Sequence, residues 1–181
     1  MSQLKVKTQQ ESGLVAKESL HQFLTFLVGS NNFGINILDV KEIIEFNMIT
    51  RVPMTPDYIR GVINLRGNVV PVIDLSARMG HARSEISKRT CIVLVQIGYH
   101  EESQLLGMLV DSVDEILDLP DSMIMPPPDF GADIRTDFIQ GMGRVGSEFI
   151  ILLDINRVLE LQELSELKQL SVGNQTIKNE V

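Results

Sequence analysis

Residues 58–75, YIRGVINLRGNVVPVIDL, contain the pattern that decides the fold. Two runs rich in β-branched residues, 59–65 and 69–73, flank the dipeptide Gly67-Asn68. Glycine and asparagine are the residues that most readily adopt the positive φ of a hairpin turn. The stretch therefore predicts a strand, a tight turn and a second strand, with the charged side chain of Arg66 held beside the turn.

The pattern around this hairpin occurs twice in the chain. At an offset of 73 residues, 33–53 aligns with 106–126, and at an offset of 80 residues, 58–75 aligns with 138–155. Most other aligned pairs keep their apolar or polar character, so we infer an internal duplication. The identical pairs include Gly34 and Gly107, Val40 and Val113, Glu42 and Glu115, Ile43 and Ile116, Ile59 and Ile139, Gly61 and Gly141, and Asp74 and Asp154.

Each copy contains about five short runs of strand type with turn signals every 8 to 12 residues, a spacing typical of small β-barrels. The sequence predicts a mainly β fold of two pseudo-symmetric five-stranded barrels. The first is expected at about 30–90 and the second at about 91–154, with the strand predicted at 21–28 as a candidate addition to the second. Units of about 70 residues are marginal alone, so a shared buried face is expected to stabilise both.

The ends of the chain carry different patterns. Residues 1–20 and 171–181 are polar and without apolar periodicity, and are expected to be mobile tails on either side of a domain at 21–170. Beyond Asp154, apolar residues recur every three positions among glutamates, which predicts a C-terminal helix at 155–170 packed on the second barrel.

Two local patterns are informative. Residues 38–45 fit either a short helix or a bent strand, and the sequence leaves that choice open. Asp74 suits the N-cap of a short helix that would end at Gly80, because its side-chain oxygen can accept a hydrogen bond from a free backbone N–H of the first turn.

Composition argues against several classes of protein. The net charge is −8 and the basic residues are scattered, which disfavours nucleic-acid binding and attachment to anionic lipid. No apolar run approaches the roughly 20 residues that span a bilayer, so no direct membrane insertion is expected. The N-terminus lacks the apolar stretch of a secretory signal, and the single Cys91 cannot form an internal disulfide. These features favour a cytoplasmic protein that meets small molecules or other proteins.

No catalytic, cofactor or metal site is predicted. Residues 141–146, GMGRVG, match the glycine pattern of a dinucleotide site, but they lead into a run of strand type, whereas such a site opens a helix. The three histidines lie far apart without metal-ligand spacing. The alternative that remains is a small-molecule or nucleotide-binding protein that uses the cleft between the barrels.

The two copies differ at the end of the hairpin. Position 66 is arginine and the aligned position 146 is glycine, whereas Glu42 and Glu115 are both glutamates. The difference indicates that Arg66 has a role specific to the first copy. The alternative is that Arg66 is an ordinary solvated arginine beside a turn. An exposed ion pair between Glu42 and Arg66 would add only about 0–1 kcal/mol to stability. Its value would lie in presenting a defined polar surface, so we expect a docking surface here.

The chain from Phe23 to Leu161 resembles the CheW family of bacterial chemotaxis coupling proteins. The segment NLRG at 64–67 is specific to that family. The matching runs are FGINILDVKEI (33–43), TPDYIRGVINLRGNVVPVIDL (55–75), LLGMLVDSVDEIL (105–117) and FIQGMG with ILLDI (within 138–155).

This resemblance implies two SH3-like barrels and an adaptor without catalytic activity or cofactor. It implies two partners, the cytoplasmic tips of methyl-accepting chemoreceptors and the regulatory domain of a CheA-type histidine kinase, and a place in the cytoplasm at receptor arrays. A related module in another CheA-like pathway is not distinguished. The residues that the resemblance assigns to receptor contact are Val40, Glu42, Gly61, Arg66 and Val113, with Glu42 and Arg66 paired.

Overall fold

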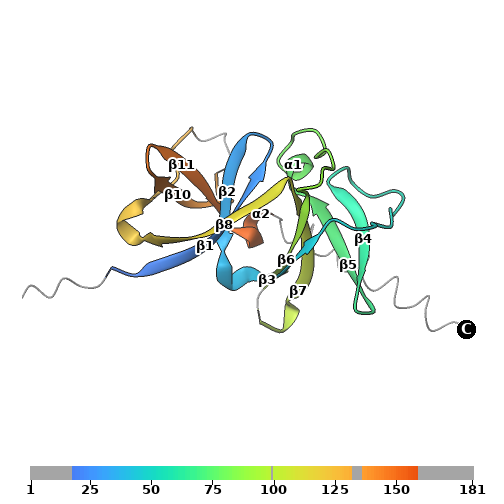
Figure 1. Cartoon of the computed structure of the whole chain (residues 1–181). Helices are drawn as coiled ribbons and strands as arrows, with labels where there is room; N and C mark the ends of the chain where they lie inside the picture. Colours follow the sequence, from blue (N-terminus) through green and yellow to red (C-terminus); the bar gives the residue numbers. More distant parts are fainter. Residues whose placement is uncertain (1–17, 99, 132–135, 159–181) are drawn as a thin grey trace, which may run out of the picture.

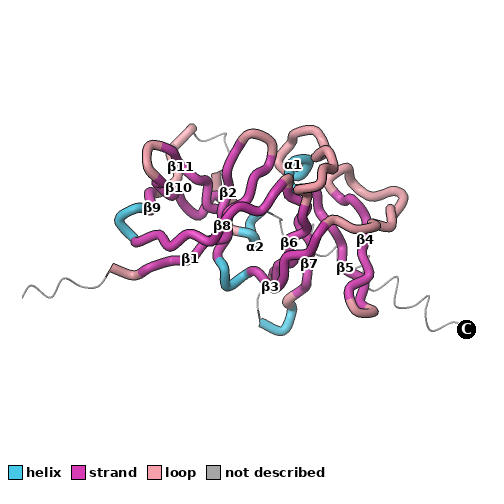
Figure 2. Tube along the Cα trace, in the orientation of Figure 1, coloured by secondary structure: helices cyan, strands magenta, loops and turns pink. Residues whose placement is uncertain are grey.

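The computed structural model describes residues 18–98, 100–131 and 136–158 (Figure 1). The tail expected at 171–181, nearly all of the tail expected at 1–20 and most of the helix expected at 155–170 lie outside these residues. The prediction of a mainly β fold is confirmed, because the described chain forms two sheets whose strands are joined by turns, loops and single-turn helices (Figure 2). None of the described helices is long and apolar enough to cross a membrane.

One sheet has six strands in the order β8-β1-β2-β11-β10-β9. Five strands were expected, and the sixth is the two-residue strand β9. Their bounds are β1 Leu20–Val28, β2 Asn31–Asn36, β8 Ser112–Pro120, β9 Ile124–Met125, β10 Ile139–Val145 and β11 Glu148–Leu153.

The other sheet has five strands in the order β3-β6-β7-β5-β4. Helix α1 (Leu75–Arg78) follows β5, and helix α2 (Ile155–Val158) follows β11. The strand bounds are β3 Val40–Glu45, β4 Ile59–Leu65, β5 Asn68–Asp74, β6 Cys91–Ile97 and β7 Gln104–Val110.

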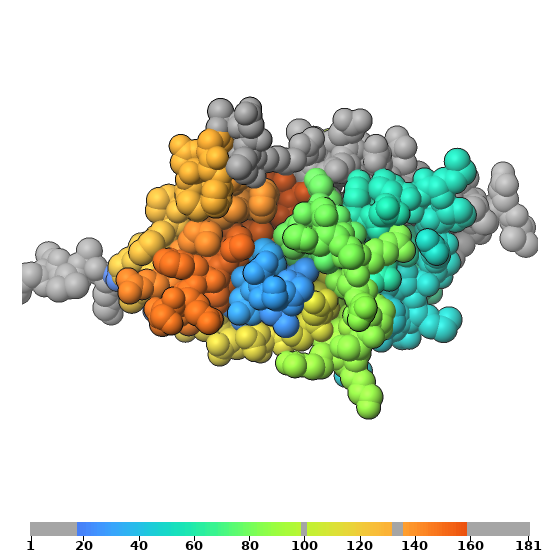
Figure 3. All heavy atoms as spheres, turned by 90° about the horizontal axis from the view of Figure 1, so that it is seen from above, coloured from blue at the N-terminus to red at the C-terminus, as the bar shows by residue number. Residues whose placement is uncertain are grey.

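The two copies exchange their first hairpins. β1 and β2 come from the first copy, yet β1 pairs with β8 and β2 runs parallel to β11 in the six-stranded sheet. Conversely, β6 and β7 come from the second copy, yet β6 pairs with β3 and β7 runs parallel to β5. Seen from above, residues of the first hairpin (blue) lie between the orange surface of the second copy and the green surface that follows α1 (Figure 3).

The strand predicted at 21–28 joins the sheet of the second copy as β1, as the sequence suggested, but the sheets otherwise differ from the expected division at 30–90 and 91–154. β2 lies in the sheet of the later residues, and the span from β6 to β7 lies in the sheet of the earlier ones. The physical reason is that similarity between copies identifies which strands are repeated, whereas long-range contacts decide which strand pairs with which. The exchange is reciprocal, because the parallel pair Gly34–Leu152 has its counterpart in Gly107–Val72.

The largest hydrophobic cluster lies between the two sheets. It combines buried residues of both copies, such as Phe26 and Ile35 from one sheet and Val95 and Met108 from the other. Two smaller clusters belong to single sheets, one around Val72 and Leu94 and the other around Phe23 and Leu152. The face shared by the sheets is therefore the principal core, and burial of apolar area there is the main source of stability.

The two local patterns are resolved. Residues 38–45 combine both expected alternatives, because a 3₁₀ turn, Ile37–Asp39, leads directly into strand β3, Val40–Glu45. The Asp74 side chain accepts a hydrogen bond from the Ala77 N–H, which confirms it as the N-cap of α1.

Candidate functional site

Three of the five residues expected to contact a receptor lie between the two edge strands of the five-stranded sheet, where the turn after β4 contacts β3 and the loop after β3 contacts β4. β3 and β4 stand at opposite ends of the strand order. Glu42 lies on β3, Gly61 lies on β4, and Arg66 lies in the turn between β4 and β5. We call the junction of Glu42, Gly61 and Arg66 the seam.

An ion pair joins the two sides of the seam. Nη2 of Arg66 lies 2.9 Å from Oε1 of Glu42, and the Arg66 side chain is 73% exposed against 35% for Glu42. Such an exposed pair contributes about 0–1 kcal/mol to stability. A guanidinium has five N–H donors, so a contact to one carboxylate holds it in place while leaving others directed at solvent. The pair therefore presents an oriented donor surface.

The turn that carries Arg66 lies one residue earlier than predicted. Leu65 pairs with Asn68, so the two-residue loop is Arg66-Gly67, and Asn68 begins β5. Both loop residues have positive φ, 51° at Arg66 and 86° at Gly67, as a type I′ turn requires. For a residue with a Cβ, this conformation costs about 1–2 kcal/mol. Arg66 is therefore held at a strained position in the turn rather than beside it.

Gly61 is buried and has a backbone role. Its φ is 142°, and a Cβ there would lie 2.1 Å from the backbone oxygen of Thr50. Thr50 and Val62 exchange two backbone hydrogen bonds of 2.9 Å, which attach the loop after β3 to the edge of β4. Gly61 admits that loop and shapes the seam without offering a side chain. Gly141 has the same place beside β9 in the second copy, where a Cβ would lie 2.9 Å from Ile124 Cγ2.

Val40 and Val113 lie away from the turn. Each stands at or near the start of a strand, β3 or β8, just after the chain has crossed from one sheet to the other. Both are half-buried against the large cluster between the sheets. The five predicted residues therefore divide into a seam in one sheet and two valines at the join of the sheets.

Sequence reasoning did not identify Asn64. This exposed residue lies near the end of β4, and its Oδ1 accepts a hydrogen bond of 2.8 Å from the N–H of Gly67. Short amide side chains that bond to backbone beyond them are a recognised turn signal. An asparagine three residues before the glycine of the hairpin turn could have predicted this hydrogen bond from the sequence.

Asp39 lies at the crossing from β2 to β3, where the second copy has Ser112. Burial raises the pKa of the Asp39 carboxyl, the nearby carboxylate of Asp154 raises it further, and Lys41 lowers it. Ionisation of Asp39 is therefore unfavourable at this crossing, and the aligned Ser112 of the second copy carries no charge.

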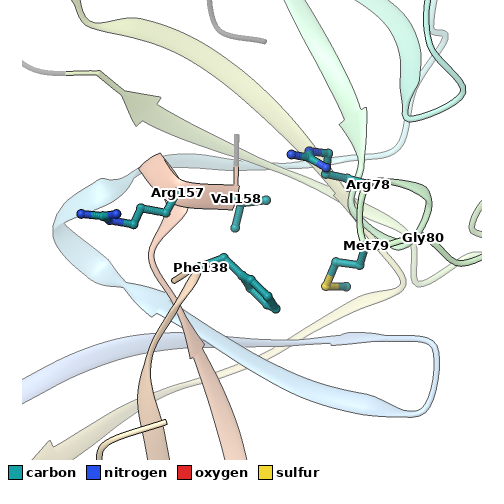
Figure 4. A pocket seen from close by; sticks show the side chains of 6 residues that line it. All are labelled: Arg78, Met79, Gly80, Phe138, Arg157 and Val158. Atoms are coloured by element: carbon teal, nitrogen blue, oxygen red, sulfur yellow. The ribbon is translucent and has the colours of Figure 1, made fainter. Parts of the chain in front are cut away.

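A cavity of about 300 Å³ lies between the two short helices (Figure 4). Phe138 and Met79 point toward each other there, whereas Arg157 extends away from them. The cavity is lined by Arg78, Met79, Gly80, Phe138, Arg157 and Val158.

Both arginines of this cavity have contacts within the protein. Cζ of Arg78 lies 5.3 Å from the centre of the Tyr58 ring, and Nε of Arg157 lies 3.8 Å from Oδ2 of Asp154. The glycine pattern at 141–146 lies on β10 and its turn and leads into β11. It therefore opens no helix, and the dinucleotide interpretation fails as expected from the sequence.

Comparison with known proteins yields one consistent family. The profile of the CheW-like domain matches residues 22–163. Chemotaxis protein CheW of Klebsiella aerogenes is 35% identical over 144 residues, which cover 80% of this chain and 84% of that protein. Chemotaxis protein CheW of Rhizobium meliloti is 36% identical over 142 residues, which cover 78% of this chain and 89% of that protein.

A solved structure agrees in fold. The crystal structure of scaffolding protein TtCheW from Thermoanaerobacter tengcongensis matches with a TM-score of 0.70 and 32% identity, over 80% of this chain and 96% of that one. The fold of two sheets, the NLRG hairpin and these similarities agree, and the chain belongs to the CheW family.

Proposed function

We propose that this protein is a non-catalytic chemotaxis adaptor that links the cytoplasmic tips of methyl-accepting chemoreceptors to the regulatory domain of a CheA-type histidine kinase. The observation that carries the proposal is the exposed Glu42–Arg66 pair, which stands in the first copy only. Family membership supports the role of a scaffold, since a matched relative is titled a scaffolding protein and others are named chemotaxis proteins. The place of action is the cytoplasm, at receptor arrays.

The seam is suited to binding a protein rather than to chemistry. Arginine is among the residues enriched at the energetic centres of protein interfaces, because its donors and its flat apolar faces are both used. The Arg66 guanidinium is directed by Glu42 and carried on a hairpin whose strands pair without interruption from Gly61–Val72 to Leu65–Asn68. A rigid framework lowers the entropy lost when the side chain is bound. The receptor tip would supply hydrogen-bond acceptors opposite Arg66.

Receptor binding of an Arg66→Ala variant tests this role, with Arg144→Ala as the matched control. Arg144 is also an exposed arginine near a hairpin turn, but it belongs to the second copy. We expect Arg66→Ala to weaken binding to a receptor-tip fragment about tenfold, equal to about 1.4 kcal/mol, and Arg144→Ala to leave it unchanged. Titration of the full chain with the fragment measures both. Undiminished binding by Arg66→Ala would refute the receptor site.

The kinase contact is tested separately in the same preparations. Because the seam is assigned to the receptor, Arg66→Ala is expected to retain binding to the CheA regulatory domain. Loss of both partners together, with an unchanged melting temperature, would mean that the seam serves the kinase or both partners.

A second candidate function is favoured by the cavity between α1 and α2. Its apolar walls would suit a small flat ligand such as a nucleotide base, and the two arginines at its rim would have to leave Tyr58 and Asp154 to meet a phosphate. The test is the melting temperature with and without millimolar ATP, GTP or purines, since a ligand that binds only the folded state raises it. A shift of several degrees that is lost in Phe138→Ala would favour this function, and no shift would dismiss it.

A further inference from the structure

We infer that Asn64 is a positioning residue for Arg66, so that Asn64, the Arg66-Gly67 turn and Glu42 act as one unit in docking. The inference rests on the proposed receptor role of Arg66 and deepens it, because it assigns a part to a residue outside the ion pair that crosses the seam.

The first observation is the hydrogen bond that closes the turn. Oδ1 of Asn64 accepts the N–H of Gly67 at 2.8 Å, so a side chain on β4 holds the second residue of the loop. Asn64 itself is exposed and pairs with Val69 across the hairpin. It therefore fixes the loop from the strand without being part of the buried core.

The second observation is the strained backbone of the loop. Arg66 has a φ of 51°, and the aligned Gly146 has a φ of 61°. Glycine adopts this conformation without the steric conflict that a Cβ brings. A Cβ at Gly146 would meet nothing within 4 Å, so tertiary packing does not demand glycine there. The first copy thus has an arginine where the backbone favours glycine, and it needs other contacts to hold the loop.

The third observation is that these contacts occur together in one copy. The residue aligned with Asn64 is Arg144, and the residue aligned with Arg66 is Gly146. The second hairpin therefore has neither the amide that receives the loop N–H nor the guanidinium that meets a glutamate. Only the first copy combines the amide, the strained arginine and the ion pair of 2.9 Å to Glu42.

These observations give a sequence of causes. The amide of Asn64 holds Gly67, the held loop directs the Arg66 side chain toward β3, and Glu42 receives the guanidinium there. Without the amide, the loop N–H loses its partner and the guanidinium samples directions away from Glu42. The charge of the site stays the same while its geometry loosens, so binding of the receptor tip is weakened without loss of the fold.

The experiment uses the full chain and a receptor-tip fragment, with Asn64→Ala, Asn68→Ala, Arg66→Ala and the double variant Asn64→Ala/Arg66→Ala. Asn68 is the matched control, an exposed asparagine at the other side of the same loop. We expect Asn64→Ala to weaken binding about three- to tenfold and Asn68→Ala to leave it unchanged. The double variant is expected to bind like Arg66→Ala alone, because residues that act through one contact are not additive.

Two further measurements separate positioning from general damage. Hydrogen exchange of the Gly67 amide is expected to be faster in Asn64→Ala and unchanged in Asn68→Ala. Asn64→Asp keeps an acceptor at the same place, so its Gly67 amide is expected to exchange as slowly as in the natural chain, although the added carboxylate changes the charge beside Arg66. If the Gly67 amide of Asn64→Ala exchanges no faster than that of the natural chain, the hydrogen bond to Gly67 is not the cause and the inference fails.

The outcomes also separate this inference from the proposed function. If Arg66→Ala binds normally, the receptor role of the seam fails. If Arg66→Ala is weakened and Asn64→Ala is not, only the positioning role fails. Additive losses in the double variant would show that Asn64 acts independently of Arg66, which would also overturn it.

Discussion

The hairpin of β4 and β5 and the hairpin of β10 and β11 share a framework and differ at their ends. In both, the register shifts by one residue directly after the first pair, Ile59–Ile73 or Ile139–Leu153. In both, a glycine follows that shift and lets a passing segment approach the edge strand. What recurs in both copies therefore serves the folding of a barrel.

The differences lie where the strands leave the sheet. At the turn, the first copy has Arg66 where the second has Gly146. At the other end, Asp74 accepts a hydrogen bond of 2.9 Å from Nε of Arg60, whereas the residue aligned with Arg60 is Gln140. Polar interactions specific to the first copy thus occupy both ends of its hairpin. Residues that differ between the two copies are therefore the ones to test, either for a role in function or for a role in holding the ends of one hairpin.

The largest expected loss of stability is that of Asp74→Ala, compared with Asp154→Ala at the aligned position of the second copy. Asp74 is fully buried, and its Oδ2 also accepts the N–H of Ser84 at 2.9 Å, while the Asp154 side chain is 35% exposed. Asp74→Ala would leave the largely buried Arg60 without its carboxylate and is expected to cost about 3–5 kcal/mol. Asp154→Ala removes the side chain whose Oδ1 accepts the Asn156 N–H at 3.1 Å at the start of α2, and should cost about 1 kcal/mol. Urea unfolding measures both, and equal losses would show that the ends are equivalent.

The next effect compares the two framework glycines. Gly61→Ala would place a Cβ 2.1 Å from a backbone oxygen at a φ of 142°, whereas the Cβ of Gly141→Ala would lie 2.9 Å from Ile124 Cγ2 and 3.0 Å from the backbone oxygen of Met125. The overlap at Gly61 is much the deeper and adds to backbone strain, so we expect losses of about 3 and about 1 kcal/mol respectively. Thermal unfolding followed by circular dichroism is the measurement. A reversed order would mean that the β9 segment is the more rigid of the two.

A smaller effect exchanges the turns. Arg66→Gly removes strain of about 1–2 kcal/mol and an ion pair of about 0–1 kcal/mol, so the free energy of unfolding is expected to rise by about 1 kcal/mol. Gly146→Arg introduces the strain without Asn64 or its equivalent and should lower it by about 1 kcal/mol. Urea unfolding again decides. A clear loss of stability in Arg66→Gly would show that Arg66 is kept for the fold and would weaken the case for a docking role.

The smallest effect concerns Asp39, whose counterpart is the uncharged Ser112. The pKa of Asp39 is raised in the folded state by burial and by Asp154, so ionisation costs folding stability once the pH exceeds the ordinary value of 3.8. Asp39→Asn is therefore expected to be more stable than the natural chain at pH 7. The advantage should shrink as the pH falls to 3.8 and below, where the carboxyl is protonated in both states. Unfolding curves at pH 7 and pH 4 measure this, and an advantage that is constant with pH would exclude the electrostatic cause.

Some features of this protein were predictable because they depend on residues close together in sequence. The hairpin at 58–75 and the Asp74 cap follow from turn residues, β-branched runs and a short polar side chain, whereas the choice at 38–45 stayed open until the structure placed a 3₁₀ turn before β3. The turn was misplaced by one residue, because Gly67-Asn68 and Arg66-Gly67 both fit the composition rules. Only the pairing of Leu65 with Asn68 separates them.

The amino-acid sequence by itself determined the mainly β class, the duplication and the expectation that Arg66 is special to one copy. It did so because strand periodicity and internal similarity are written along the chain. The tertiary structure alone decided that the copies exchange their first hairpins, that Gly61 is buried beside Thr50, and that Asn64 holds the loop of Arg66 opposite Glu42. Those features depend on long-range pairing between strands, and no local pattern specifies which of two similar hairpins a given edge will accept.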